Sequence, residues 1–156
     1  MKSSNNKGLK KGIVCLFIFS VVLGITGTSL MAQCRTYAKN TCESQLDDYL
    51  LNGRMYGGYM IQGQNTELYV VLSAGQKYRL VGCTKESLGQ LWIQIIDGKG
   101  HVIFDNTEYD LVQNWDFTVK STQEFKIRTF IPEPKGKTEQ KMRDCSLMLI
   151  GSKGSS

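Results

Sequence analysis

Oxygen-bearing side chains gather between residues 97 and 110 of this 156-residue chain. They are Asp97, Asp105, Asn106, Glu108 and Asp110. Calcium prefers oxygen ligands and tolerates irregular loops, so these five residues form a candidate calcium site, although no EF-hand spacing accompanies them. The loop carboxylates are also the residues that a divergent hydrolase would use as its acid and base. No other cofactor is indicated.

Recognisable catalytic machinery is absent from the sequence. It contains no G-x-S-x-G, no H-E-x-x-H and a single histidine, His101, directly after a Gly-rich turn. A hydrolase needs an activated nucleophile or a metal-bound water, and a lone histidine beside a hairpin is typical of an exposed strand residue. The sequence therefore predicts a protein that is not an enzyme.

A second set of candidate residues is aromatic. The side chains that fall outside the predicted core faces are those of Tyr56, Tyr59, Tyr69, Trp92 and Tyr109. Exposed aromatic rings bind sugars or peptides by stacking and apolar contact, whereas packing under a helix or a second sheet is the alternative role. The expected partners are accordingly an extracellular glycan or peptide, or an envelope protein.

The first 32 residues have the three regions of a secretory signal peptide. A basic stretch from Lys2 to Lys11 precedes the apolar run Ile13–Ile25, and small Ala32 precedes the expected cleavage site before Gln33. An uncleaved anchor over Gly12–Gln33 is an alternative, because about 20 residues span a bilayer. A lipidated Cys34 is disfavoured because Gln33 precedes it. The sequence predicts export to the periplasm or the extracellular space, without a stable membrane span after cleavage.

The cysteines agree with export. Four follow the signal peptide, Cys34, Cys42, Cys83 and Cys145, whereas Cys15 lies within it. An even number in an exported domain predicts two disulfides, for which three pairings exist. The preferred prediction pairs Cys34 with Cys42 and Cys83 with Cys145. A metal site is disfavoured, because there is no C-x-x-C and only one histidine.

The net charge of +5 does not indicate a nucleic-acid partner. Four of the 19 basic residues are lysines of the signal peptide, which leaves 15 basic against 14 acidic residues, a net charge of +1. Without a basic excess, the electrostatic attraction that drives polyanion binding is missing. With 41% hydrophobic residues, the composition is that of a globular domain.

The elements that must position these residues are mainly strands. A helix is predicted over residues 42–52, with Asn40 as its N-cap and Gly53 at its C-terminal end. Two-residue alternation then predicts about eight strands, at 57–63, 66–73, 76–83, 90–96, 101–104, 114–119, 123–131 and 145–151. The predicted fold is a jelly-roll-like antiparallel β-sandwich with one short N-terminal helix. Its parts are a signal peptide (1–32), a lead-in (33–65), the sandwich (66–150) and a disordered tail (151–156).

Residues 66–150 also carry turn and core motifs in a characteristic order. AGQKY (74–78) is followed by DGKG (97–100), the aromatic strand NWDFTV (114–119) and EFKI (124–127). This order resembles the pre-peptidase C-terminal domain and related GOLD-like jelly-roll modules of exported bacterial proteins. The chain departs from those modules in reading STQEF at 121–125, where a Thr-Gly-x-Tyr turn is usual. The resemblance implies a β-sandwich, and some such modules bind calcium.

Overall fold

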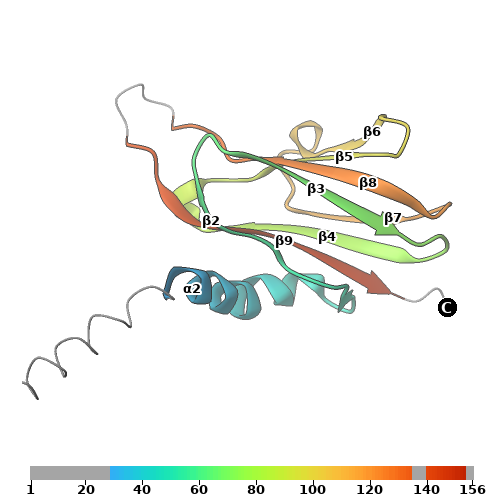
Figure 1. Cartoon of the computed structure of the whole chain (residues 1–156), viewed down its shortest axis with the longest axis horizontal. Coiled ribbons are helices and arrows are strands. Elements are labelled where there is room, and N and C mark those ends of the chain that lie inside the picture. Colours follow the sequence, from blue (N-terminus) through green and yellow to red (C-terminus); the bar gives the residue numbers. More distant parts are fainter. Residues whose placement is uncertain (1–28, 135–139, 154–156) are drawn as a thin grey trace, which may run out of the picture.

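The computed structural model describes residues 29–134 and 140–153. They form two antiparallel sheets packed face to face, with a helical segment against the outside of one sheet (Figure 1). We call that one the covered sheet; it contains β1 (Leu50–Leu51), β2 (Tyr56–Ile61), β4 (Lys77–Thr84), β7 (Asn114–Thr118) and β9 (Arg143–Lys153). The open sheet contains β3 (Asn65–Leu72), β5 (Trp92–Ile96), β6 (Val102–Asp105) and β8 (Gln123–Phe130). The predicted antiparallel β-sandwich is confirmed.

Burial along the strands follows from these layers. In β3, exposed Glu67, Tyr69 and Val71 alternate with less exposed residues, because only one face of the open sheet meets the core. In β9, residues 145–151 are all buried. One side of this strand contributes Met148 and Ile150 to the core between the sheets, and the other side faces the helical segment. Burial on both faces explains its nearly continuous apolar sequence.

The helical segment begins earlier than predicted. It consists of α2 (Ser29–Tyr37), a π-helical turn η1 (Ala38–Cys42) and a 3₁₀ turn η2 (Glu43–Leu46). Its sheet-facing stripe is Cys34, Ala38, Cys42 and Leu46, all buried at a spacing of four residues. The helix expected over 42–52 is therefore wrong in position. Cysteine and alanine supply most of the buried stripe, whereas the prediction followed the larger apolar residues after Cys42.

The same stripe decides the disulfide pairing. Cys34 is bonded to Cys145 of β9, and Cys42 is bonded to Cys83 of β4. The preferred pairing of Cys34 with Cys42 and of Cys83 with Cys145 is wrong. Eight residues of helix separate Cys34 from Cys42 by about 12 Å at 1.5 Å per residue. A disulfide requires Cα atoms within about 7 Å, so each helical cysteine pairs with the strand beneath it.

The strands extend beyond the expected sandwich boundaries. β1 and β2 belong to the segment expected as a lead-in, and β9 continues to Lys153, where a tail was expected. The predicted signal peptide lies mostly outside the described residues, and its last four, 29–32, begin α2. Among the residues described, no helix combines the length and apolarity that crossing a membrane requires.

The turn after η2 contacts an ion pair on the covered sheet through Tyr49. The Arg79 guanidinium donates from Nε and Nη2 to the two carboxylate oxygens of Asp116, at 2.6 and 2.7 Å. The Tyr49 ring packs against the same guanidinium, 4.8 Å from its carbon. The hydrogen bond from Arg79 lowers the pKa of Asp116 below its ordinary value of 3.8.

We expect the disulfide pairing to be visible in a non-reducing tryptic digest. The four cysteines fall on four different tryptic peptides, because arginine or lysine separates each from the next. The peptide ending at Arg35 should be cross-linked to 144–153, and 40–54 to 80–85. A cross-link between the peptide ending at Arg35 and 40–54 would contradict the structure.

Asp116→Asn should reduce stability in a pH-dependent way. A carboxylate whose pKa is lowered by folding stabilises the native state well above its unfolded-state pKa, and this stabilisation is lost as the pH falls through the folded-state pKa. We expect a difference of about 1 kcal/mol or less at pH 7, because Asp116 is partly exposed. Urea unfolding should show the difference vanishing in acid. An equal difference at pH 7 and pH 2 would contradict this role.

Candidate functional site

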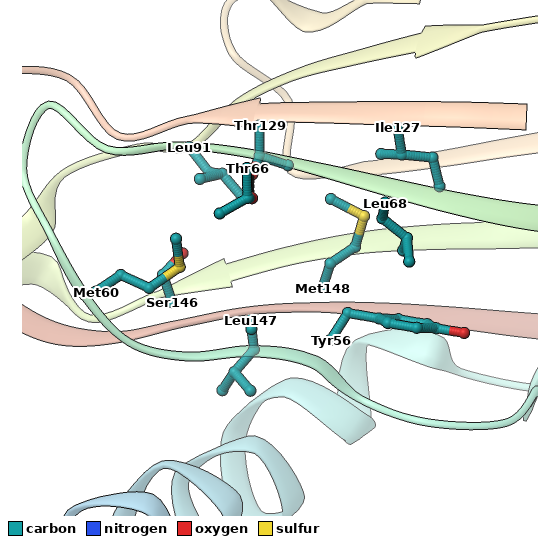
Figure 2. Close-up of a pocket in the computed structure, with 11 residues that line it drawn as sticks. Tyr56, Met60, Thr66, Leu68, Leu91, Ile127, Thr129, Ser146, Leu147 and Met148 are labelled. Carbon is teal, nitrogen blue, oxygen red and sulfur yellow. Dashed lines mark hydrogen bonds between the residues drawn. The ribbon is translucent and has the colours of Figure 1, made fainter.

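The described cavity between the two sheets is too small for a ligand. Figure 2 shows the space between the sheets, which is lined by Thr66, Thr129, Ser146, Met148 and seven other residues. The cavity is about 30 Å³, roughly the share of one water molecule in the liquid. The hydroxyl groups of Thr66 and Thr129 satisfy each other at 2.5 Å. Depressions large enough for a small ligand lie on the surface.

The long connections between strands meet at one end of the sandwich. The β4–β5 and β6–β7 connections and the described parts of the β8–β9 connection lie where β5 begins, while Gly-rich or short turns join strands at the opposite end. Between these connections lies a depression of about 760 Å³, which we call the end groove. Its described lining consists of Gln62, 86–90, Trp92, Leu111, 132–134, Gln140 and Met142. This volume lies within the range of small-ligand sites.

Hydrogen bonds join the connections that line the end groove. The Gln62 amide donates to the Ser87 carbonyl at 3.4 Å and accepts from the Met142 backbone N–H at 2.9 Å. The Ser87 hydroxyl donates to Asp144 at the start of β9, at 2.9 Å. These bonds join the β2–β3 and β4–β5 connections to the described part of the β8–β9 connection and restrict their relative movement.

The wall formed by the β6–β7 connection depends on Asn106, which is fully buried in η4 (Asn106–Glu108). Its Oδ1 accepts from the Ile93 N–H at 2.8 Å, and its Nδ2 donates to the carbonyls of Leu91 and Val112 at 2.8 and 3.0 Å. The amide thus joins this connection to the start of β5. It also holds the connection where Asp110 and Leu111 adopt φ angles of 51° and 56°, a left-handed conformation unusual outside glycine.

Trp92 forms the aromatic side of the end groove. It begins β5 and points away from the core, with 42% of its surface exposed. Its ring lies 5.1 Å from that of Phe130 on the neighbouring strand, in a tilted contact. A ring held from one side and open on another is a preorganised surface for stacking.

The structure does not assemble the five predicted calcium ligands. Asp97 lies in the β5–β6 turn and Asp105 at the far end of β6, while the Asn106 oxygen is committed to the Ile93 N–H. No group of three or more acidic, histidine or cysteine side chains within 29–134 and 140–153 is suited to hold a metal ion. Asn106 is therefore wrong as a ligand. Calcium binding through exposed Glu108 and Asp110 stays a prediction that a calcium titration of the melting temperature would test.

The loop carboxylates are held by the backbone of their own turns. Asp97 Oδ1 accepts from the N–H groups of Lys99 and His101, and Asp105 Oδ1 accepts from that of Thr107. The backbone hydrogen bond from His101 lowers the pKa of Asp97. Burial opposes the shift at Asp105, but hydrogen bonds from Gln94 and Thr107 still lower its pKa. Both stay ionised at neutral pH, whereas a general acid requires a raised pKa.

The five predicted aromatic residues are not brought together. Tyr56 is half-buried and packs against the core, and Tyr59 lies on β2 of the covered sheet. Tyr69 lies on β3, and Tyr109 stacks on Phe104 at 5.8 Å. Trp92 is the member of the set that lines the end groove. Its neighbours Leu111, Gln90 and Gln140 were missed, because isolated loop residues carry no periodic signal.

A second depression lies between α2 and β2, with a volume of about 790 Å³. Arg35 and Arg54 line it, together with Met31 and Ala32. The last two belong to the predicted signal peptide, so the shape of this depression depends on processing. The end groove consists of residues that cleavage would leave in place, and it is the better candidate.

The chain has a distant likeness to a known structure. No family model and no curated protein matches the chain. Among solved structures, it is similar to Aeromonas hydrophila PliG, a periplasmic inhibitor of g-type lysozyme. The alignment covers 66% of this chain and 88% of that one, with 9% identity and a TM-score of 0.48. At this level the likeness bears on neither ligand nor activity. The resemblance to pre-peptidase C-terminal modules stays a prediction.

Asn106→Ala should destabilise the protein by about 3 kcal/mol, because it removes the partner of the Ile93 N–H and of the Val112 carbonyl, while the Leu91 carbonyl keeps the Gln113 amide. Urea unfolding of the disulfide-bonded protein measures the loss. Glu108→Ala, at an exposed position of the same 3₁₀ turn, serves as the control and should change stability by less than about 0.5 kcal/mol. Similar stabilities for the two variants would show that Asn106 does not hold this connection.

Proposed function

We propose that this chain is an exported, non-catalytic binding protein whose ligand occupies the end groove. The single observation that carries the proposal is the contrast in space: the groove measures about 760 Å³ at the loop end, whereas the core cavity measures about 30 Å³. Loops held by a rigid scaffold are where binding residues concentrate. Here the hydrogen bonds of Gln62 and Asn106 provide that rigidity.

Export is supported by the cysteines. Cys34, Cys42, Cys83 and Cys145 form two disulfides, which persist in oxidising compartments such as the periplasm or the extracellular space. The predicted signal peptide agrees with this location. Fractionation of the producing cells would distinguish the periplasm from the extracellular space.

The absence of catalysis is supported by the chemistry of the groove. Its described ionisable residues are Glu86 and Glu133, and Glu133 is paired with Lys141 at 2.8 Å. His101 lies in the distant β5–β6 turn, with a side chain that is 71% exposed. The described lining contains no histidine that could activate the Ser87 hydroxyl, and this supports binding rather than turnover.

A structural docking subunit is the second candidate, and the open sheet favours it. Tyr69 and Val71 are 56% and 63% exposed on the outer face of β3, an edge strand paired only with β8. Apolar residues on an uncovered sheet face are typical of protein contacts. The two candidates use different residues, so one set of variants separates them.

A ligand panel tests the proposed function. Neutral oligosaccharides and short peptides should be screened by thermal shift against wild type, Trp92→Ala and the matched control Tyr69→Ala. We expect at least one compound to raise the melting temperature of wild type and Tyr69→Ala, with the shift lost in Trp92→Ala. Mass spectrometry should recover that compound unchanged. Binding that requires Tyr69 but not Trp92, or conversion of the compound, would refute the proposal.

A further inference from the structure

We infer that a second copy of this chain pairs with the free edge of β3, so that two open sheets join into one continuous antiparallel sheet across a two-fold axis. This interface goes beyond the proposed function, because the described lining of the end groove contains no residue of β3. Three features support it: the unprotected edge of β3, the apolar side chains beside that edge, and a strand sequence that complements itself.

The free edge of β3 lacks the features that usually prevent strands from pairing. Within the described residues, β8 is the one neighbour of β3 in its sheet. β3 is eight residues long, contains neither proline nor lysine, and keeps one register with β8 from Asn65 to Leu72. The other edge strand of the open sheet, β6, is four residues long, and its register with β5 is interrupted. Short strands, bulges, proline and lysine protect natural sheet edges, so β3 is the less protected edge.

The backbone of β3 directs hydrogen-bonding groups toward this edge. The Ile131 N–H donates to the Gln64 carbonyl at 3.1 Å, where the ladder between β3 and β8 begins. Hydrogen-bonded and non-hydrogen-bonded pairs alternate along an antiparallel ladder. The even-numbered residues of β3 therefore direct their N–H and C=O groups toward β8. Glu67, Tyr69 and Val71 direct theirs outward, where a further strand can pair with them.

Apolar side chains lie along the same edge. Tyr69 and Val71 are 56% and 63% exposed on the outer face, and Leu68 and Val70 are only partly buried on the core face. Beneath β3, the edge of the covered sheet consists of β1 and β2, because residues of β2 and β3 line the same cavity. Leu50 of β1 is 78% exposed there. A strand added beside β3 would extend both faces of this edge.

The sequence of β3 complements itself in one antiparallel register. When Val70 lies opposite Val70 of the second copy, Tyr69 faces Val71 on the outer side of the joined sheet. On the core side, Leu68 then faces Leu72. An aromatic residue opposite a β-branched residue is a favourable cross-strand pair, and the two-fold axis forms each of these pairs twice.

The neighbouring registers lose these pairs. Centring the strands on Tyr69 places Glu67 opposite Val71, centring them on Leu68 places Glu67 opposite Tyr69, and centring them on Val71 places Tyr69 opposite Ser73. In the register centred on Val70, Glu67 faces Ser73 and keeps its ion pairs with two basic residues of β8. Two identical strands carry this complementary pattern, whereas an unrelated strand would have to match it. The sequence of β3 therefore favours a second copy as the occupant.

Sedimentation velocity over a range of concentrations tests the association, and wild type should shift from monomer to dimer. Val71→Lys should weaken the dimer about tenfold or more, because lysine replaces the apolar partner of Tyr69 on both sides of the two-fold axis. The matched control is Val102→Lys, which places the same charge at a 53% exposed valine on β6. This control and Trp92→Ala should dimerise like wild type. Circular dichroism checks that each variant is folded.

Cysteine cross-linking tests the register. Val70→Cys should form an intermolecular disulfide, because the Cα atoms of a non-hydrogen-bonded antiparallel pair lie about 4.5 Å apart. Leu68→Cys is the matched control, since four residues of strand would separate its two copies by about 13 Å. Non-reducing electrophoresis of protein with both native disulfides intact measures the cross-linked dimer.

Several results would overturn the inference. Wild type that stays monomeric at every concentration, or a dimer that Val71→Lys does not weaken, shows that a second copy does not occupy the β3 edge. Cross-linking of Leu68→Cys as efficient as that of Val70→Cys overturns the register. These failures are separate from failure of the proposed function, because a ligand of the end groove should bind Val71→Lys and wild type equally well.

Discussion

The attachment of the helical segment to the covered sheet is the constraint on which the rest of the structure depends. Two disulfides connect Cys34 to β9 and Cys42 to β4, and the buried stripe between them packs on the same strands. Each bond restricts the unfolded chain over a long loop, and removing a native disulfide costs about 2–5 kcal/mol. The helical segment thereby covers one sheet, while Tyr69 and Val71 stay exposed on the other.

Rigidity at the loop end has a different origin. No cross-link reaches the end groove within the described residues; instead, the side-chain amides of buried Asn106 and half-buried Gln62 join its connections. Asn106 joins the β6–β7 connection to β5, and Gln62 joins the β4–β5 and β8–β9 connections. A buried polar group that loses its partner costs more than the hydrogen bond is worth on balance. These hydrogen bonds stabilise the observed conformation of the described loop residues, in which Trp92, Gln90 and Gln140 are exposed.

Asn106 shows why the site was harder to predict than the fold. In the sequence it lies among four acidic residues, and these acidic neighbours suggested that it is a metal ligand. In the structure it is the one fully buried member of the group, and its partners Leu91 and Ile93 are 13 to 15 residues away along the chain. Hydrogen bonds between residues that far apart produce no periodic pattern in the sequence. The five predicted aromatic residues are not brought together either, because neighbouring strands and connections place them on different faces.

The sequence by itself determined the fold class, the strand-rich order of elements and the presence of paired cysteines. Two-residue alternation is a local property, and it reports which strands have one face in a core. Tertiary structure alone decided which cysteines meet, where the helical segment begins and which residues surround the end groove. These features depend on distances between segments far apart in the chain, such as the 111 residues between Cys34 and Cys145, and local pattern contains no measure of those distances.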